Sequence, residues 1–217
     1  MEGVYEGDQV KGIREGKGKL KWPNGDIYEG DFHAGLRHGH GVFIFGRKRP
    51  NGQHRYEGQW HRSMRQGQGK EEWPNGDRYE GEYKEDLFDG KGILVSRKTR
   101  YEGEFVAGSK EGWGSMRYAS GAQYQGEFKA NRLHGYGEYT WPDGRRYAGE
   151  WEDGIRQGKG VFTTAEGEKH DGEWHKGEKH GPGVQRWKNG KARPGEWERG
   201  RLLRWAGPEV FGLTGKE

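Results

Sequence analysis

The chain has 217 residues, of which 29% are apolar, 33% are charged and 43 are glycine. This composition excludes a large hydrophobic core, and the near balance of 38 basic and 34 acidic residues argues against wholesale nucleic-acid binding. Aromatic residues reach 13%, more than a disordered chain would carry. The lack of cysteine, of a long apolar run and of a signal-like opening predicts a cytoplasmic or ciliary protein with no integral membrane segment.

A short aromatic motif, Tyr-Glu-Gly or a variant of it, opens a repeat about every 23 residues. Position three of the repeat is always glycine, and position five is aromatic in nearly every copy. This spacing of two predicts a β-strand with positions one, three and five on one face. In chain order the copies start at Tyr5, Tyr28, Tyr56, Tyr79, Tyr101, Tyr124, Tyr147, His170 and Arg193.

A second strand follows the first in each repeat and opens with Gly-x-Gly, as in Gly39/Gly41. Small or turn-forming residues at position eight predict a tight turn between the two strands, and Trp-Pro-Asn-Gly or Trp-Pro-Asp-Gly turns the chain back. Because strand glycines weaken a sheet unless something approaches the backbone closely, we expect the aromatic rings to lie over them. The prediction is an all-β fold, an elongated single-sheet solenoid of stacked β-hairpins with no compact globular core.

The succession of Tyr-Glu-Gly-Glu-Trp, Gly-x-Gly and Pro-Asn-Gly or Pro-Asp-Gly resembles the MORN (membrane occupation and recognition nexus) repeat. The resemblance divides the chain into an N-terminal lead at 1–4, eight hairpin repeats at 5–192, and a degenerate repeat with an apolar C-terminal cap at 193–217. In size and organisation the chain is similar to the ciliary group of MORN proteins. This similarity implies a non-catalytic scaffold subunit of the radial spoke head, in the axoneme of a cilium or flagellum, that contributes to motility regulation. The implied partners are other spoke-head subunits, including a second MORN-repeat protein.

An aromatic row on the second strands is the leading candidate for a protein-binding surface. Aromatic anchors dominate protein interfaces, and such a row fits a partner helix or an extended segment. The alternative is that the rings are only core, buried on their own glycines. The residues that we expect to be most exposed form the aromatic furrow: Trp22, Phe45, Trp73, Tyr118, Trp141 and Trp187.

A basic row near the hairpin tips, with at most one residue in each repeat, is the second candidate. It fits an acidic protein surface or anionic phospholipid headgroups, and so it supports a rival function, that of a peripheral membrane adaptor. The alternative is a solvated edge that blocks unwanted strand pairing. This basic edge consists of Arg14, Arg37, Arg65, Lys110, Arg156 and Lys179.

Two segments depart from the repeat. An insertion in the second copy gives a candidate docking loop, although turns also tolerate insertions that have no role. The tail after Arg201 is apolar, and we expect it either to cover the last hairpin or to contact another subunit. The docking loop carries Arg47, Lys48, Arg49 and Arg55, and the C-terminal contact or cap carries Leu202, Leu203, Trp205 and Phe211.

The sequence pattern contains no clear motif for catalysis or for binding a cofactor. His33, His38 and His40 lie close together in the sequence, but the last two occupy ordinary variable positions of the repeat, so we expect no metal site. The Gly-x-Gly pairs lack the following helix and lysine of a phosphate cradle, and no serine lies in a nucleophile-elbow setting. We therefore expect no enzymatic activity, no cofactor, no nucleic-acid partner and at most weak binding to anionic lipid.

Overall fold

Antiparallel β-strands make up the regular secondary structure of the computed structural model, which describes residues 3–46 and 54–211. The chain divides into two units, unit 1 comprising Met1–Ser109 and unit 2 comprising Lys110–Glu217. Within the described ranges there is no helix, and so none that is long and apolar enough to span a membrane.

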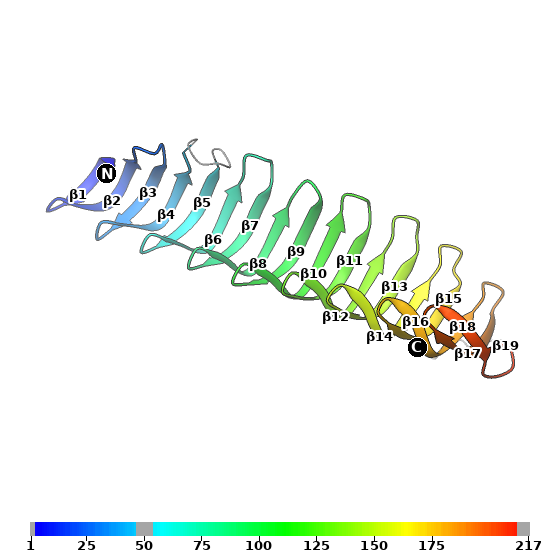
Figure 1. Ribbon diagram of the computed structural model, residues 1–217. Helices are drawn as coiled ribbons and strands as arrows, with labels where there is room; N and C mark the ends of the chain where they lie inside the picture. Colours follow the sequence, from blue (N-terminus) through cyan, green and yellow to red (C-terminus); the bar gives the residue numbers. More distant parts are fainter. Residues whose placement is uncertain (1–2, 47–53, 212–217) are drawn as a thin grey trace. The chain divides into compact units, whose positions relative to one another are not determined.

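In unit 1 each strand pairs with its neighbour in sequence, and together they form an open antiparallel sheet (Figure 1). Turns at both ends of the strands join them, as expected for a row of hairpins. The strands are β1 (Val4–Val10), β2 (Ile13–Lys21), β3 (Ile27–His33), β4 (Leu36–Ile44), β5 (Arg55–His61), β6 (Met64–Glu72), β7 (Arg78–Lys84), β8 (Leu87–Val95) and β9 (Thr99–Val106).

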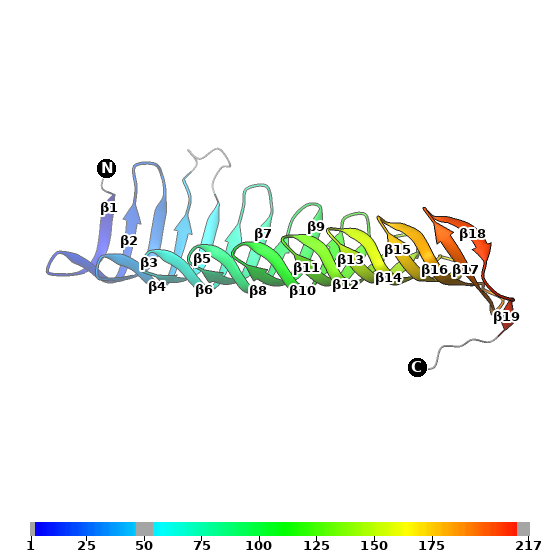
Figure 2. The ribbon, with the colours of Figure 1, turned by 60° about the horizontal axis from the view of Figure 1, so that its bottom comes forward.

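Unit 2 repeats this plan and adds a further hairpin at its end, formed by β17 and β18. A short last strand, β19, pairs with the beginning of β17, where Val210 lies opposite Ala192. Figure 2 shows the strands of unit 2, in green to red, as a single layer. The strands are β10 (Ser109–Tyr118), β11 (Gln123–Lys129), β12 (Arg132–Thr140), β13 (Arg146–Glu152), β14 (Ile155–Thr163), β15 (Lys169–His175), β16 (Glu178–Arg186), β17 (Lys191–Glu198), β18 (Arg201–Trp205) and β19 (Val210–Phe211).

The predicted all-β fold of stacked hairpins is confirmed, and so is the tight turn at position eight. His33 pairs with Leu36, which leaves Ala34 and Gly35 as a two-residue loop with φ angles of 49° and 80°. Two successive positive φ angles give the turn type whose twist matches that of the flanking strands. The sequence pattern identified the second of these positions, but not the first, which is mostly occupied by residues other than glycine.

The core of most hairpins is a tyrosine ring that lies over a pair of facing glycines. Tyr28 is fully buried, and Gly30 lies opposite Gly41 in the paired strand. A Cβ atom built on Gly41 would lie 2.3 Å from the Tyr28 hydroxyl oxygen, which donates a hydrogen bond to the Asp31 carbonyl at 2.9 Å. The glycines are therefore required because the ring occupies the space of a side chain. The same arrangement recurs at Tyr56, Tyr79, Tyr124 and Tyr147.

The position-five rings connect one hairpin to the next. Tyr28 contacts Phe32 of its own repeat and Trp60 of the following repeat, both edge to face, with centroid distances of 5.1 Å and 5.4 Å. Edge-to-face contacts of this kind stabilise aromatic pairs beyond the area that they bury. Every ring of this set is buried: Phe32, Trp60, Tyr83, Phe105, Phe128, Trp151, Trp174 and Trp197.

A β-bulge interrupts most of the hairpins beside the paired glycines, which sequence periodicity did not reveal. Asp31 pairs with His38, while Gly30 pairs with Gly41, so Gly39 and His40 have no partner in β3. Gly39 has a φ of 56°, and the backbone N–H of His40 donates to the Asp31 carboxylate at 2.9 Å. Position four thus carries an acceptor for the bulge as well as a surface charge.

Candidate functional site

The aromatic face of each unit has a deep tier and a shallow tier of rings. The deep tier consists of the buried position-one tyrosines and position-five rings, for which the alternative of pure core is correct. The shallow tier is the aromatic furrow, whose residues are all half-buried. Each unit carries part of it: Trp22, Phe45 and Trp73 lie in unit 1, and Tyr118, Trp141 and Trp187 lie in unit 2. The furrow keeps exposed aromatic surface, and its role in binding stays a prediction.

In unit 1 a histidine continues the shallow tier between two furrow residues. The ring of His54 stacks on Phe45 with a centroid distance of 3.5 Å and lies 6.4 Å from Trp73. Sequence reasoning did not single out His54, which belongs to the inserted segment and not to a regular repeat position.

In unit 2 the shallow tier is made of tyrosine and tryptophan rings. The Tyr118 and Tyr139 centroids are 5.9 Å apart, and Tyr139 lies 4.7 Å from Trp141. Nearer the C-terminus, Trp187 lies 5.7 Å from Trp205. Because the rings are close neighbours, a partner segment on this face would contact several of them together.

The basic edge lies over the aromatic face rather than apart from it. The Arg37 guanidinium carbon is 4.3 Å from the Trp60 ring centroid, and its Nη2 donates to the Ser63 carbonyl at 2.7 Å. Both contacts are made with the following repeat, so the arginine joins two hairpins through a cation–π contact and a hydrogen bond. The same pair of contacts recurs for Arg156 with Trp174 and Gly177.

Burial changes the electrostatics of this row. Desolvation lowers the pKa of Arg37, Lys110, Arg156 and Lys179, and for Arg156 the positive charge of Arg145 lowers it further. All six residues of the basic edge are half-buried. The row is therefore not the solvated edge that one interpretation of the sequence expected, and its contact with an acidic partner or a lipid surface stays a prediction.

A buried acidic network in unit 1 was not visible in the sequence pattern. Glu71 is 4% exposed and occupies a second-strand position that is apolar in most other copies. Its carboxylate accepts hydrogen bonds from Arg65 Nη1 at 2.7 Å and from the Tyr83 hydroxyl at 3.1 Å, and it lies 3.1 Å from His54 Nε2. Burial and the Glu71 charge raise the pKa of Tyr83. The neighbouring side chains thus satisfy the hydrogen-bonding capacity of this carboxylate, which is typical of a structural role.

The docking loop is described only at its end. Arg47, Lys48 and Arg49 lie outside the described residues, whereas Arg55 is half-buried and its Nη2 lies 2.6 Å from a Glu57 carboxylate oxygen. The loop's role in docking stays a prediction.

The apolar tail forms strands at the edge of unit 2. Leu202 and Leu203 of β18 are 39% and 59% exposed, while Trp205 is half-buried and lies 6.1 Å from the Trp197 ring. Phe211, in β19, lies opposite Lys191 of β17. The tail therefore extends the sheet and also leaves two leucines open to a partner.

The reverse face of unit 2 carries two exposed aromatic residues that sequence reasoning did not single out. Trp113 and Tyr136 are 49% and 55% exposed, and each is the central residue of a Gly-x-Gly pair. Alternation along a strand places them opposite the aromatic face. On the reverse face of unit 1, His33 Nδ1 lies 2.7 Å from Glu15, but no group of three or more His, Asp or Glu in the described part of the chain is arranged to hold a metal ion.

Comparison with known families gives eight matches to the model described as the MORN repeat. They cover well over half of the chain, at residues 5–27, 28–47, 56–78, 79–98, 101–123, 124–145, 147–169 and 170–192. Among curated proteins, Alsin of Rattus norvegicus, of Homo sapiens and of Mus musculus is each 28% identical over 119 residues. That stretch is 52% of this chain and only 7% of Alsin.

Two solved structures align with parts of this chain at low similarity. The TCP10 domain of Danio rerio CPAP aligns with a TM-score of 0.47 and 11% identity, covering 88% of each chain. The TCP domain of Drosophila melanogaster SAS-4, solved with a proline-rich motif of Ana2, aligns with a TM-score of 0.41 and 14% identity. It covers 73% of this chain and 84% of that domain.

Proposed function

Because the chain belongs to the MORN repeat family, whose repeats indicate a structural role in binding proteins or membranes, we propose that it is a non-catalytic scaffold that assembles other proteins on its aromatic face. The observation that carries this proposal is the shallow tier of half-buried rings in each unit. These rings sit on a rigid layer of buried tyrosines and glycines, so a partner would bind a surface that is already ordered.

The electrostatics of the aromatic face favour a protein over a membrane. A peripheral membrane adaptor needs basic side chains that reach the headgroups, whereas Arg37 and Arg156 lie over rings and donate to backbone carbonyls. Arg65 is held by Glu71 and Asp86, at 2.7 Å and 3.1 Å. These side chains therefore lie within the aromatic face instead of extending from it toward a membrane surface.

The finer proposal places the scaffold in the radial spoke head of a ciliary or flagellar axoneme, where it contributes to motility regulation beside other spoke-head subunits, one of them a second MORN protein. Its support is the organisation of the repeats, which is similar to that of ciliary MORN proteins.

The test is a pull-down with the full chain from detergent-extracted axonemes and, in parallel, from membrane fractions. We expect the wild type to recover axonemal proteins, and the double variant Trp73→Ala/Trp141→Ala to lose them. The matched control is Trp113→Ala/Tyr136→Ala, which removes two aromatic residues from the reverse face and should leave recovery unchanged. Circular dichroism and thermal melting check that both variants stay folded.

Recovery that is insensitive to the furrow variant would overturn the aromatic face as the binding surface. Capture of anionic membranes alone, abolished by added salt, would replace the scaffold with the membrane adaptor.

A further inference from the structure

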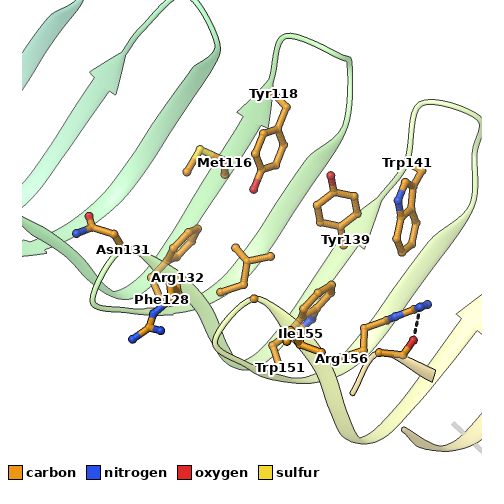
Figure 3. Close-up of a pocket in the computed structure, with 13 residues that line it drawn as sticks. Met116, Tyr118, Phe128, Asn131, Arg132, Tyr139, Trp141, Trp151, Ile155 and Arg156 are labelled. Carbon is orange, nitrogen blue, oxygen red and sulfur yellow. Dashed lines mark hydrogen bonds between the residues drawn. The ribbon is translucent and has the colours of Figure 1, made fainter. Parts of the chain in front are cut away.

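A hollow of about 550 Å³ opens on the aromatic face of unit 2. Figure 3 shows Tyr118, Tyr139 and Trp141 along one side of it and Trp151 and Arg156 along the other. All of its lining residues belong to unit 2, and most of them are apolar or aromatic.

The hollow lies where the basic row is interrupted. Leu133 occupies the position that holds Arg37, Arg65 and Arg156 in other copies. In the fourth repeat Phe88 takes this position and stacks on Tyr79 at a centroid distance of 3.7 Å, so the face stays covered there. Leucine is shorter than either residue and cannot cover the rings of the next repeat. The hollow therefore follows from a single departure from the repeat pattern.

The same departure leaves a backbone acceptor uncovered. Arg156 donates to the carbonyl of Gly177, at the turn of the following repeat. The corresponding carbonyl for Leu133 is that of Gly154, which lines the hollow. Among the described residues no side chain donates to it, so it can accept an N–H from a partner backbone.

Two hydroxyls in the hollow also have no partner within the described part of the chain, those of Tyr118 and Tyr139. Burial raises the pKa of both phenols, so they remain protonated and able to donate hydrogen bonds at neutral pH. By contrast, the buried tyrosines of the deep tier donate to backbone carbonyls, as Tyr147 does to Glu150.

Arg156 adds a half-buried positive charge at the rim. No carboxylate of the described residues lies within ion-pair distance of it, whereas Arg65, at the same position of another repeat, pairs with Glu71 and Asp86. The nearby Arg145 is itself paired with Asp143, at 2.7 Å. A desolvated guanidinium without a counter-charge favours a ligand that supplies a carboxylate.

We propose, on the basis of the scaffold function above, that this hollow binds a partner protein segment in which a bulky apolar residue stands next to Asp or Glu. The apolar side chain fills the space left by Leu133, against Tyr139 and Trp151. The neighbouring carboxylate pairs with Arg156 and accepts hydrogen bonds from the tyrosine hydroxyls, and a backbone N–H of the segment donates to the Gly154 carbonyl.

The first test selects displayed random 12-residue peptides on the immobilised full chain and, in parallel, on its Leu133→Arg variant. Arginine stands at this position in four other repeats, as Arg14, Arg37, Arg65 and Arg156, so the variant should fold and close the hollow. We expect the wild type to enrich sequences with adjacent bulky apolar and acidic residues, and the variant to lose them. If no family of peptides enriched on the wild type is lost on Leu133→Arg, the proposal is overturned.

The second test measures fluorescence polarisation with the most enriched peptide and with its acid-to-amide counterpart. Arg156→Met and the amide peptide should each weaken binding at least tenfold, while Arg146→Met, a matched substitution on the reverse face, should leave it unchanged. Equal affinity of the acidic and amide peptides would overturn the carboxylate contact. Binding of phosphatidylserine vesicles that is lost in Leu133→Arg, with no peptide selected, would assign the hollow to lipid.

The scaffold proposal can survive the failure of this one. If Leu133→Arg recovers the same axonemal proteins as the wild type while Trp73→Ala/Trp141→Ala does not, the furrow is the binding surface and the hollow is not its anchor. If neither variant changes recovery, both proposals fail.

Discussion

His170 stands at position one of the eighth repeat, where the seven preceding copies have a tyrosine; the hydroxyl of Tyr28, for example, donates to a backbone carbonyl. Its ring is 1% exposed, and neither ring nitrogen has a hydrogen-bond partner in the described structure. Burial and the charge of Lys179 lower its pKa to about 4. A buried imidazole without hydrogen-bond partners lowers the free energy of unfolding, so we expect this repeat to be less stable than its neighbours.

Replacing His170 with tyrosine should therefore stabilise unit 2. The hydroxyl of the His170→Tyr variant would donate to the Glu173 carbonyl, as Tyr147 donates to Glu150, and we expect a gain of about 1–2 kcal/mol in the free energy of unfolding. The measurement is urea denaturation of both proteins at pH 7. An unchanged or lower midpoint for the variant would contradict this reading of the site.

The same residue gives a pH dependence with a definite sign. The folded-state pKa of His170, about 4, lies below its ordinary value of 6.5, so protonation favours the unfolded chain between these values. The contribution is complete above pH 6.5 and is lost as the pH falls toward 4, by up to about 3 kcal/mol. Subtracting the His170→Tyr stability profile from that of the wild type should isolate this loss. Parallel profiles down to pH 4 would disprove it.

Glu71 is a second buried residue that departs from the repeat pattern, because most other copies have an apolar residue at this position. Glu71→Ala removes the acceptor of the buried Tyr83 hydroxyl and one carboxylate of Arg65, so we expect a loss of about 2–4 kcal/mol. The double variant Arg65→Met/Glu71→Leu also removes the charge that is left without its partner and should recover part of that loss, although the Tyr83 hydroxyl still lacks its acceptor. The measurement is thermal melting of the wild type, of Glu71→Ala and of the double variant. A double variant no more stable than Glu71→Ala would contradict the view that the unpaired Arg65 charge causes part of the loss.

At the scale of the hairpin, the pairing of tyrosine with facing glycines is the unit that the repeat preserves. Gly41→Ala should cost about 2–4 kcal/mol, because the new Cβ would lie within 2.3 Å of the Tyr28 hydroxyl oxygen. In a Tyr28→Ala background the clash disappears, so the same change should cost at least about 1 kcal/mol less. A double-mutant cycle by urea denaturation measures this coupling. Additive costs would mean that backbone conformation, and not the ring, requires the glycine.

The elements that the sequence predicted are those set by local chemistry. Strands follow from the alternation at positions one, three and five, and turns follow from residues such as Gly35 that accept a positive φ. The bulge at Gly39 was not predicted, because its stabilising contact joins Asp31 to a residue of the other strand. The place of Arg37 was missed for a similar reason, since its ring and carbonyl partners belong to the next repeat.

The sequence predicted which residues lie on the aromatic face more reliably than it predicted how exposed they are. The furrow residues do lie on the face that carries the tyrosines, but a one-dimensional pattern could not show that they are only half-buried. Nor could it show that Leu133, an unremarkable leucine in the sequence, opens a hollow because it stands in an arginine position. Departures from a repeat are informative only once the contacts of the regular residue are known.

At the scale of the whole molecule, the candidate binding residues of each unit are distributed over several repeats instead of being gathered in one cleft. Each unit contributes three furrow residues, and each uses its arginines to join consecutive repeats. A distributed surface of this kind suits a scaffold, because several partner residues can engage it in series. It also implies that no single furrow substitution abolishes assembly, which is why the variants proposed above change two residues together.

The central claim is that partners bind the aromatic face, and hydroxyl-radical footprinting of the tryptophans tests it most directly. The chain would be oxidised alone and within the assembly recovered from axonemes, and the modification of each tryptophan would be quantified by mass spectrometry. The account predicts that Trp73, Trp141 and Trp187 become protected in the assembly while Trp113, on the reverse face, stays as reactive as in the free chain. Protection of Trp113 with unchanged reactivity at Trp73, Trp141 and Trp187 would contradict it.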